Sequence, residues 1–290
     1  MEPEFQKQHQ VSQIYLKQFG YCDVDKQHWV SVYKVGERKT ENIKVVDFTI
    51  QTNIFDLPFE EMEIKRHFEN LSSKLENRYR TVILNLRNQK RLTLQDKDLL
   101  NYFVANMLCR TNTFRNFISV ILQDENDREV LFKEITMFPE NNNDYEELKV
   151  VLNSIKEKSK INIVICYVMN HLFEVFRRFD KVVLKDNSNI GWLTSDNPVY
   201  IDRFENHHWL IPIESEIYFP LSKDFCLFMF NSNSKFTENP LRKLKLDKPN
   251  SIDFENCDII NKKMFLENQA YLGFEYLIFN TQIAETIFAK

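Results

Sequence analysis

Glycine is scarce in this sequence. Only four of the 290 residues are glycine, at Gly20, Gly36, Gly191 and Gly273. Phosphate-binding loops of the G-x-G-x-x-G and Walker types need closely spaced glycines, so that backbone N–H groups can approach the phosphates. Neither motif occurs, and we expect no nucleotide cofactor bound through such a loop.

Cysteine pairs are also missing. The five cysteines, at positions 22, 109, 166, 226 and 257, include no C-x-x-C pair, which excludes zinc-ribbon and thioredoxin-like motifs. Cys109, Cys166 and Cys226 lie within apolar runs and are predicted to be buried thiols. Unpaired cysteines of this kind fit the reducing cytoplasm.

No apolar run approaches the ~20 residues needed to cross a bilayer. The longest candidate, residues 161–176, is interrupted by Asn162, Asn170, His171 and Glu174. The first residues, Met-Glu-Pro-Glu, lack the basic and apolar regions of a signal peptide. We therefore expect a cytoplasmic protein that does not associate with membranes.

Apolar and aromatic residues are plentiful. Hydrophobic residues make up 43% of the chain, and 25 phenylalanines predict a large aromatic core. The formal net charge of -4 excludes a wholly basic surface but allows a local basic groove for nucleic acid. Two basic clusters could form one, although charge runs also solvate ordinary helix and strand faces: Arg78, Arg80, Arg87, Lys90 and Arg91; and Arg242, Lys243, Lys245 and Lys248.

The apolar pattern changes twice along the chain. Residues 29–35 alternate as a strand, a second strand is expected at 43–46 after a turn at 36–39, and 48–57 is expected to be extended. From residue 60 the spacing becomes helical, with Asp96 expected to cap or open a second helix and further helices at 146–155 and 161–179. Short strands then follow, with a helix at 261–271 and a last strand at 276–279.

This order predicts a single α+β domain over residues 1–290: an N-terminal β-hairpin, a helical middle and a mainly antiparallel C-terminal sheet with one late helix. Within it, residues 1–58 are β, 59–180 helical and 181–290 β-rich.

Several segments occur in the order typical of one protein family. They are Gln8-His9 with Tyr15-Leu16 and Phe19; residues 29–35; Glu69 and Glu76; residues 108–111; residues 194–199, which read Thr-Ser-Asp-Asn-Pro-Val; residues 219–222; and Asn261 and Ala270. Together they resemble the uncharacterised bacterial family called domain of unknown function 4238, over residues 8–279. The resemblance implies no activity. Ser12 stands where the family usually has proline, so we expect a less rigid turn there.

His9 is the first candidate site residue. An imidazole titrates near neutral pH and could act as a general base or a metal ligand. Gln8 beside it could orient the ring or bind a substrate amide. The alternative is a histidine that caps or packs against the backbone, with Gln8 exposed.

Glu69 and Glu76 are seven residues apart, about two helical turns, so both side chains project from nearly the same face. Such carboxylates could hold a divalent cation, or could pair with Lys65 and Arg80 at the surface. Arg110 ends an apolar helical run and is expected to pair with Glu76 or Asp196. Arg115, five residues on, is expected to point away from Arg110.

Residues Ser195, Asp196 and Asn197 precede a proline between two predicted strands. Asp196 could be a carboxylate at a strand end, with Asn197 and Ser195 contacting substrate. The same residues commonly form a turn by bonding the local backbone.

Two functions are compatible with these residues. The first is a metal-dependent hydrolase, specifically a nuclease-like toxin or anti-phage effector. Glu69, Glu76 and Asp196 would hold Mg²⁺ or Mn²⁺, His9 would activate water, and Arg110 would stabilise negative charge. The second is a non-catalytic module that binds a ligand or partner, in which the same residues form a structural polar network.

Overall fold

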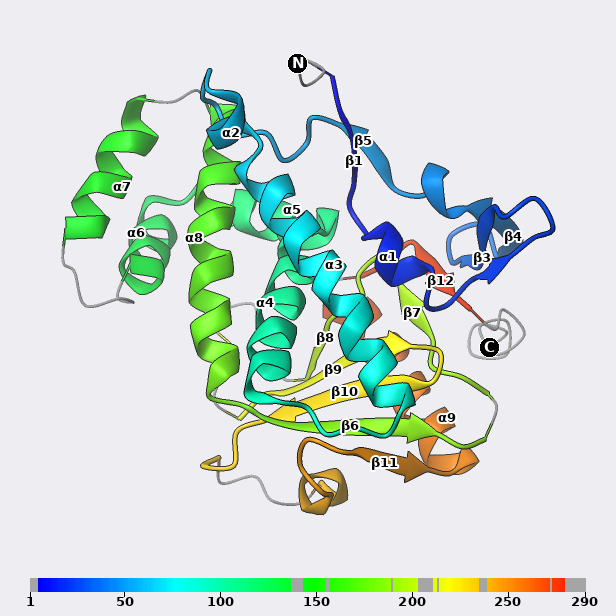
Figure 1. Cartoon of the computed structure of the whole chain (residues 1–290). Helices are drawn as coiled ribbons and strands as arrows, with labels where there is room; N and C mark the ends of the chain where they lie inside the picture. The colour runs from blue at the N-terminus through cyan, green and yellow to red at the C-terminus, as the bar shows by residue number, and fades with distance from the viewer. Residues whose placement is uncertain are drawn as a thin grey trace.

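The computed structural model describes residues 5–136, 143–154, 157–188, 190–202, 211–212, 214–234, 239–271 and 273–279. Its elements form an α+β fold in which a helical layer packs on a sheet built from the second half of the chain (Figure 1).

The N-terminal region contains a short antiparallel pair and the predicted hairpin. Its elements are β1 (Lys7–His9), α1 (Gln13–Leu16), β2 (Tyr21–Cys22), β3 (His28–Lys34), β4 (Lys39–Lys44) and β5 (Ile50–Thr52). β1 pairs with β5, and β3 pairs with β4. The hairpin is confirmed, but its second strand ends at Lys44, and the predicted strand residues 45 and 46 belong to a 3₁₀ helix, Val45–Asp47.

Ser12 begins α1. Its hydroxyl accepts a hydrogen bond from the Tyr15 N–H, and its φ of -54° lies within the range that proline adopts. The serine therefore replaces a rigid residue with a helix cap while keeping a backbone angle that proline could adopt.

The middle of the chain is helical. Its helices are α2 (Met62–Lys65), α3 (His67–Arg87), α4 (Leu94–Arg110), α5 (Asn112–Ile121), α6 (Glu125–Thr136), α7 (Asn143–Ser154) and α8 (Glu157–Arg177). Thr93, not Asp96, is the N-cap of α4; Asp96 is the third helical residue and completes a capping box by accepting from the Thr93 N–H. Thr111 separates α4 from α5 and caps α5 with its hydroxyl.

The second half supplies a mixed, mainly antiparallel sheet in the order β11-β6-β10-β9-β8. Its strands are β6 (Asp180–Asp186), β8 (Tyr200–Asp202), β9 (Glu216–Ser222), β10 (Phe225–Phe230) and β11 (Pro249–Ile252), with a 3₁₀ helix at Pro240–Lys243. Only β11 runs parallel to its neighbour. Helix α9 (Phe254–Tyr271) begins earlier than residue 261, where the sequence pattern places it.

Side chains of this sheet alternate between two cores. Val183, Leu227 and Met229 face the helical layer, whereas Val182, Leu184 and Phe228 pack with α9. The sheet is thus buried on both faces, which explains why β9 and β10 are apolar along nearly their whole length.

A further sheet joins the two ends of the chain. β12 (Tyr276–Ile278) pairs with β3 on one side and with β7 (Thr194–Ser195) on the other. Tyr15 of α1 packs on Phe219 of β9 and Phe103 of α4, so the N-terminal segment contacts both main layers.

Candidate functional site

Arg110, the last residue of α4, is the centre of a polar cluster. Its side chain is 2% exposed, and its Nε donates to the backbone oxygen of His9 at 3.0 Å. Its Nη2 lies 3.2 Å from Glu69 Oε1, and its Nη1 lies 3.5 Å from Glu76 Oε1. We call His9, Glu69, Glu76 and Arg110 the Arg110 cluster.

Both glutamates come from α3, and the expectation that they share one helix face is confirmed because both reach the same guanidinium. Lys65 lies 4.0 Å from Asp56 instead. Burial raises the pKa of Glu69, and the Arg110 charge opposes that rise. The two carboxylates therefore balance one buried arginine that also holds the N-terminal strand.

His9 lies on β1 with both ring nitrogens within hydrogen-bond distance of protein groups. Nδ1 is 3.1 Å from the Phe48 carbonyl, and Nε2 is 2.6 Å from Gln13 Nε2. Since the carbonyl can only accept, Nδ1 carries the proton and Nε2 accepts from Gln13. Burial lowers the pKa of His9, with the Phe48 carbonyl raising it and Arg110 lowering it further. The ring is thus held neutral.

Gln8 is buried beside this cluster rather than exposed. Its Oε1 accepts from the Phe55 N–H at 2.7 Å, and its Nε2 donates to Asp56 Oδ1 at 2.8 Å. Arg66 forms an ion pair with the same Asp56 oxygen. The oxygen and the nitrogen of the Gln8 amide therefore both help to fix the segment that follows β5.

Asp196 is not in contact with the Arg110 cluster. Its Oδ1 accepts from the N–H groups of Glu275 and Tyr276, each at 3.0 Å. Burial raises the pKa of Asp196 to about 6, although these two backbone donors lower it. Arg110 has Glu76 as a partner, as one alternative predicted, and not Asp196.

The neighbouring turn residues also bond the backbone. Ser195 Oγ donates to the Asn197 carbonyl at 2.7 Å, and Asn197 Nδ2 donates to the Gly273 carbonyl at 3.1 Å. Both side chains are buried. Together with Asp196 they fasten the turn after β7 to the strand β12, and their role toward a substrate stays a prediction.

A small cavity of about 250 Å³ lies beside Asp196, and Gln10 and Asn112 also line it. Throughout the described part of the chain, no three His, Cys, Asp or Glu side chains are placed to bind one metal ion together. A cation held by Glu69, Glu76 and Asp196 stays a prediction, and it would need these side chains to move.

The predicted basic clusters differ in burial. Exposed residues around the C-terminal half of α3 include Arg78, Arg80, Lys90 and Arg91. The Arg242 side chain, in contrast, is largely covered, and its Nε lies 2.8 Å from Glu216 Oε1. Lys243 and Lys245 of the second cluster are exposed as well, so contact of either cluster with nucleic acid stays a prediction.

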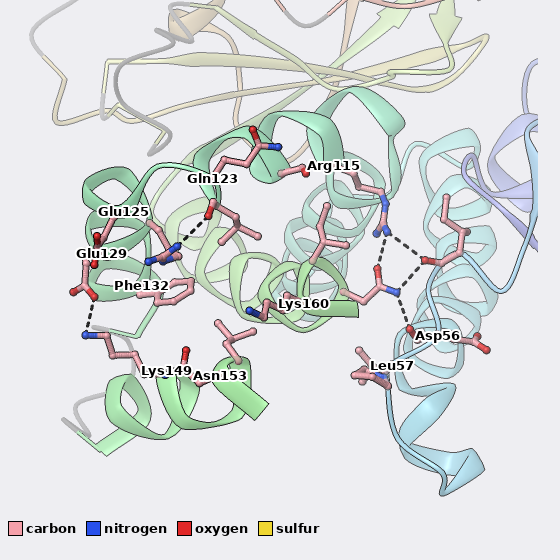
Figure 2. A pocket seen from close by; sticks show the side chains of 18 of the residues that line it. Asp56, Leu57, Arg115, Gln123, Glu125, Glu129, Phe132, Lys149, Asn153 and Lys160 are labelled. Atoms are coloured by element: carbon pink, nitrogen blue, oxygen red, sulfur yellow. Dashed lines mark hydrogen bonds and ion pairs between the residues drawn. The ribbon is translucent and has the colours of Figure 1, made fainter. Parts of the chain in front are cut away.

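A cavity of about 1210 Å³ lies between the segment 53–58 and the helices α5, α6, α7 and α8 (Figure 2). We call it the Arg115 cavity. Arg115 Nη2 donates to Asn162 Oδ1 at 2.6 Å and to the Ile54 carbonyl at 3.2 Å. Asn162 in turn donates to the carbonyls of Ile54 and Asp56 at 3.0 and 2.7 Å.

The sequence interpretation that Arg115 points away from Arg110 rests on helical spacing alone. It assumed one continuous helix, but the chain turns at Thr111. As a result the two guanidiniums lie 5.0 and 5.2 Å from the ring centroid of Phe55. Thr111 could have indicated the start of a new helix, because threonine is a favourable N-cap and a helical apolar pattern follows it.

Fold and site together define an α+β protein with a buried polar cluster that anchors its N-terminal segment, beside a large polar cavity. The family model described as "Protein of unknown function (DUF4238)" matches residues 7–282, so the chain belongs to that family. A search of curated proteins found no match, and neither did a search of solved structures. No helix among the described residues is long and apolar enough to cross a membrane.

Proposed function

We propose that the protein is a ligand-binding module, in which the Arg110 cluster is structural and the Arg115 cavity receives a small molecule. The observation that carries this proposal is the charge balance of Arg110: its buried guanidinium donates to the His9 carbonyl and forms ion pairs with Glu69 and Glu76. A buried cation that two internal carboxylates already balance has no net charge left to attract an anionic substrate.

The shape of the cavity supports the second half of the proposal. Sites for small molecules are typically ~300–1,000 Å³ and combine apolar walls with a few placed polar groups. The Arg115 cavity, at about 1210 Å³, has room for a ligand with accompanying water. Leu122, Phe132 and Leu152 supply apolar wall, and Arg115 and Asn162 supply polar groups.

The test is a thermal-shift screen with neutral, cationic and anionic metabolites. A bound ligand stabilises the native state by about 2.7 kcal/mol at 100 times its Kd, which raises the melting temperature measurably. Ser119 lines the cavity, so Ser119→Phe should occupy part of it and reduce the shift.

Val120→Phe is the matched control, because Val120 is the next residue of α5 and its side chain is 65% exposed. The control should keep the ligand-induced shift. Equal shifts in the two variants would place binding elsewhere, and the absence of any stabilising ligand across the full screen would contradict a binding function.

A metal-dependent hydrolase of the nuclease type, acting in cell toxicity or anti-phage defence, is the second candidate. It is favoured by the pKa values at the Arg110 cluster: burial raises that of Glu69 and lowers that of His9, which suits proton transfer near neutrality. Glu69 could donate a proton and the neutral His9 ring could accept one after Gln13 moves from Nε2.

This candidate is tested by incubating the protein with RNA, DNA and nucleotides, with Mg²⁺, Mn²⁺ or chelator. Cleavage that is lost in Glu69→Gln, at an unchanged melting temperature, would support the hydrolase. No cleavage, together with lower melting temperatures in Glu69→Gln and Glu76→Gln, would support the structural role.

A further inference from the structure

Arg115 is a buried arginine without a carboxylate partner. The side chain is 7% exposed, and its hydrogen-bond acceptors are the Ile54 carbonyl and the Asn162 amide oxygen, both uncharged. Among the described residues no Asp or Glu forms an ion pair with it, in contrast to Arg66 and Arg110. A buried cation without a counter-charge is costly, so sites that hold one are commonly completed by an anion.

One nitrogen of this guanidinium is also unsatisfied. Arg115 Nη1 is buried and has no hydrogen-bond partner in the described structure. Nearly all buried polar atoms in proteins are paired, and an unpaired one often marks the position of a ligand group. Its side chain lines the cavity from α5, at the end formed by Asp56 and Leu57 (Figure 2).

Charged side chains of both signs line the rest of the cavity, Glu125 and Arg128 among them. Lys149, at the α7 end, lies 2.7 Å from Glu129 and is balanced by it. Asp56 is paired with Arg66 outside the cavity. Lys160 of α8 lies between the two ends (Figure 2) and adds a second cationic side chain to the cavity.

We propose that the Arg115 cavity binds a phosphomonoester of nucleotide or sugar-phosphate size, whose phosphate is held by Arg115 and Lys160. A phosphate dianion matches two cations, and Arg115 Nη1, which has no hydrogen-bond partner, can donate to it. This inference rests on the proposed ligand-binding function and names the chemical class of the ligand.

The experiment is titration calorimetry with inorganic phosphate and with nucleoside monophosphates and sugar phosphates, each compared with its dephosphorylated parent. At least one phosphomonoester should bind, and its parent should bind at least ~10-fold more weakly, since hydrogen bonds to charged groups are the strong ones. Arg115→Gln should raise the Kd at least ~10-fold.

Two further variants keep the test decisive if Arg115→Gln folds poorly. Lys160→Gln removes the second cation from a half-buried position and should weaken the phosphomonoester more than its parent. Arg177→Gln removes an equal charge from an exposed position of α8 outside the cavity and should leave the Kd unchanged.

Parents that bind as tightly as their phosphomonoesters would overturn this inference and leave the ligand-binding function intact. Binding of carboxylates in place of phosphates would overturn the proposed class. A panel in which no phosphate compound binds would also overturn it, whereas the ligand-binding function fails only if the wider screen of neutral and cationic compounds is empty too.

Discussion

Arg110 illustrates how one buried charge can organise a chain. It joins β1, α3 and α4 by contacts with His9, Glu69 and Glu76 while its guanidinium lies over Phe55. Burying an ion pair adds little stability by itself, but removing one partner leaves the others uncompensated. The value of Arg110 is therefore that it specifies where the N-terminal strand lies.

Arg110→Ala should lower the free energy of unfolding by about 3 kcal/mol, because Glu69 and Glu76 would then repel each other in a half-buried site. Urea denaturation measures this change. Arg177→Ala, which breaks an exposed pair with Asp98, should cost less than about 1 kcal/mol. Equal costs for the two variants would show that the Arg110 cluster is not structurally important.

His171 gives a pH-dependent prediction. Burial within α8 lowers the pKa of His171 to about 4, whereas the unfolded chain has a value near 6.5. The unfolded state therefore binds an extra proton between these two pH values. The stability that neutral His171 contributes is complete above about pH 6.5 and is lost as the pH falls toward 4.

Melting temperatures of the wild type and of His171→Leu, measured from pH 7 to pH 4, check this sign. The wild type should lose more stability than the variant over that interval, because the losses from all other groups are common to both proteins. Parallel curves would mean that His171 is not held neutral in the folded protein.

At the level of elements, the positions at which helices end and new ones begin decide which side chains meet. Strands 29–35 and 225–230 and the long helices were predictable, because their apolar spacing is regular. Helices α5 and α6 and the strand β11 were not foreseen. Thr111 is compatible either with one continuous helix or with the start of a new one. The strand β11 has only four residues, which include Asn250 and Ser251, so it lacks an apolar run.

The candidate site was predictable to a similar degree. The spacing of Glu69 and Glu76 identified a shared face, and the position of Arg110 identified a buried pair. The Arg115 cavity could not be foreseen, because it depends on the packing of four helices and on the break that turns Arg115 toward Phe55. The direction of α5 is set by tertiary contacts that local spacing does not encode.

The start of α4 offers a test at this scale. Thr93 and Asp96 satisfy each other's backbone N–H groups, at 3.1 Å for Asp96 N to Thr93 Oγ1. Thr93→Ala should lower the free energy of unfolding by about 1 kcal/mol. Gln95→Ala, an exposed position in the same turn, should change it little; a similar loss for both would contradict the capping role.

In the whole molecule, the N-terminal hairpin and the last described strand share one sheet. β12 lies between β3 and β7, and Leu277 is buried in the core that also contains Trp192 and Tyr33. Leu277→Ala should lower the free energy of unfolding by about 3 kcal/mol. Exposed Glu275→Ala serves as the control, since Asp196 bonds its backbone N–H and not its side chain.

Calorimetry of Leu277→Ala adds a check on cooperativity. A loss of stability in a single transition would agree with a core that connects both ends of the chain. Two separate transitions, with only the smaller one moved, would contradict it.

The protein as a whole combines a charge-balanced polar cluster with a polar cavity, and Phe55 contacts one arginine of each. The most direct test of this division is an NMR titration with the phosphomonoester that binds most tightly, observing the Arg115 Nε–H, the Asn162 side-chain amide and the His9 ring. Shifts at Arg115 and Asn162 with His9 unchanged are the predicted result. Shifts confined to His9 and the Arg110 cluster would contradict it and would return the functional site to that cluster.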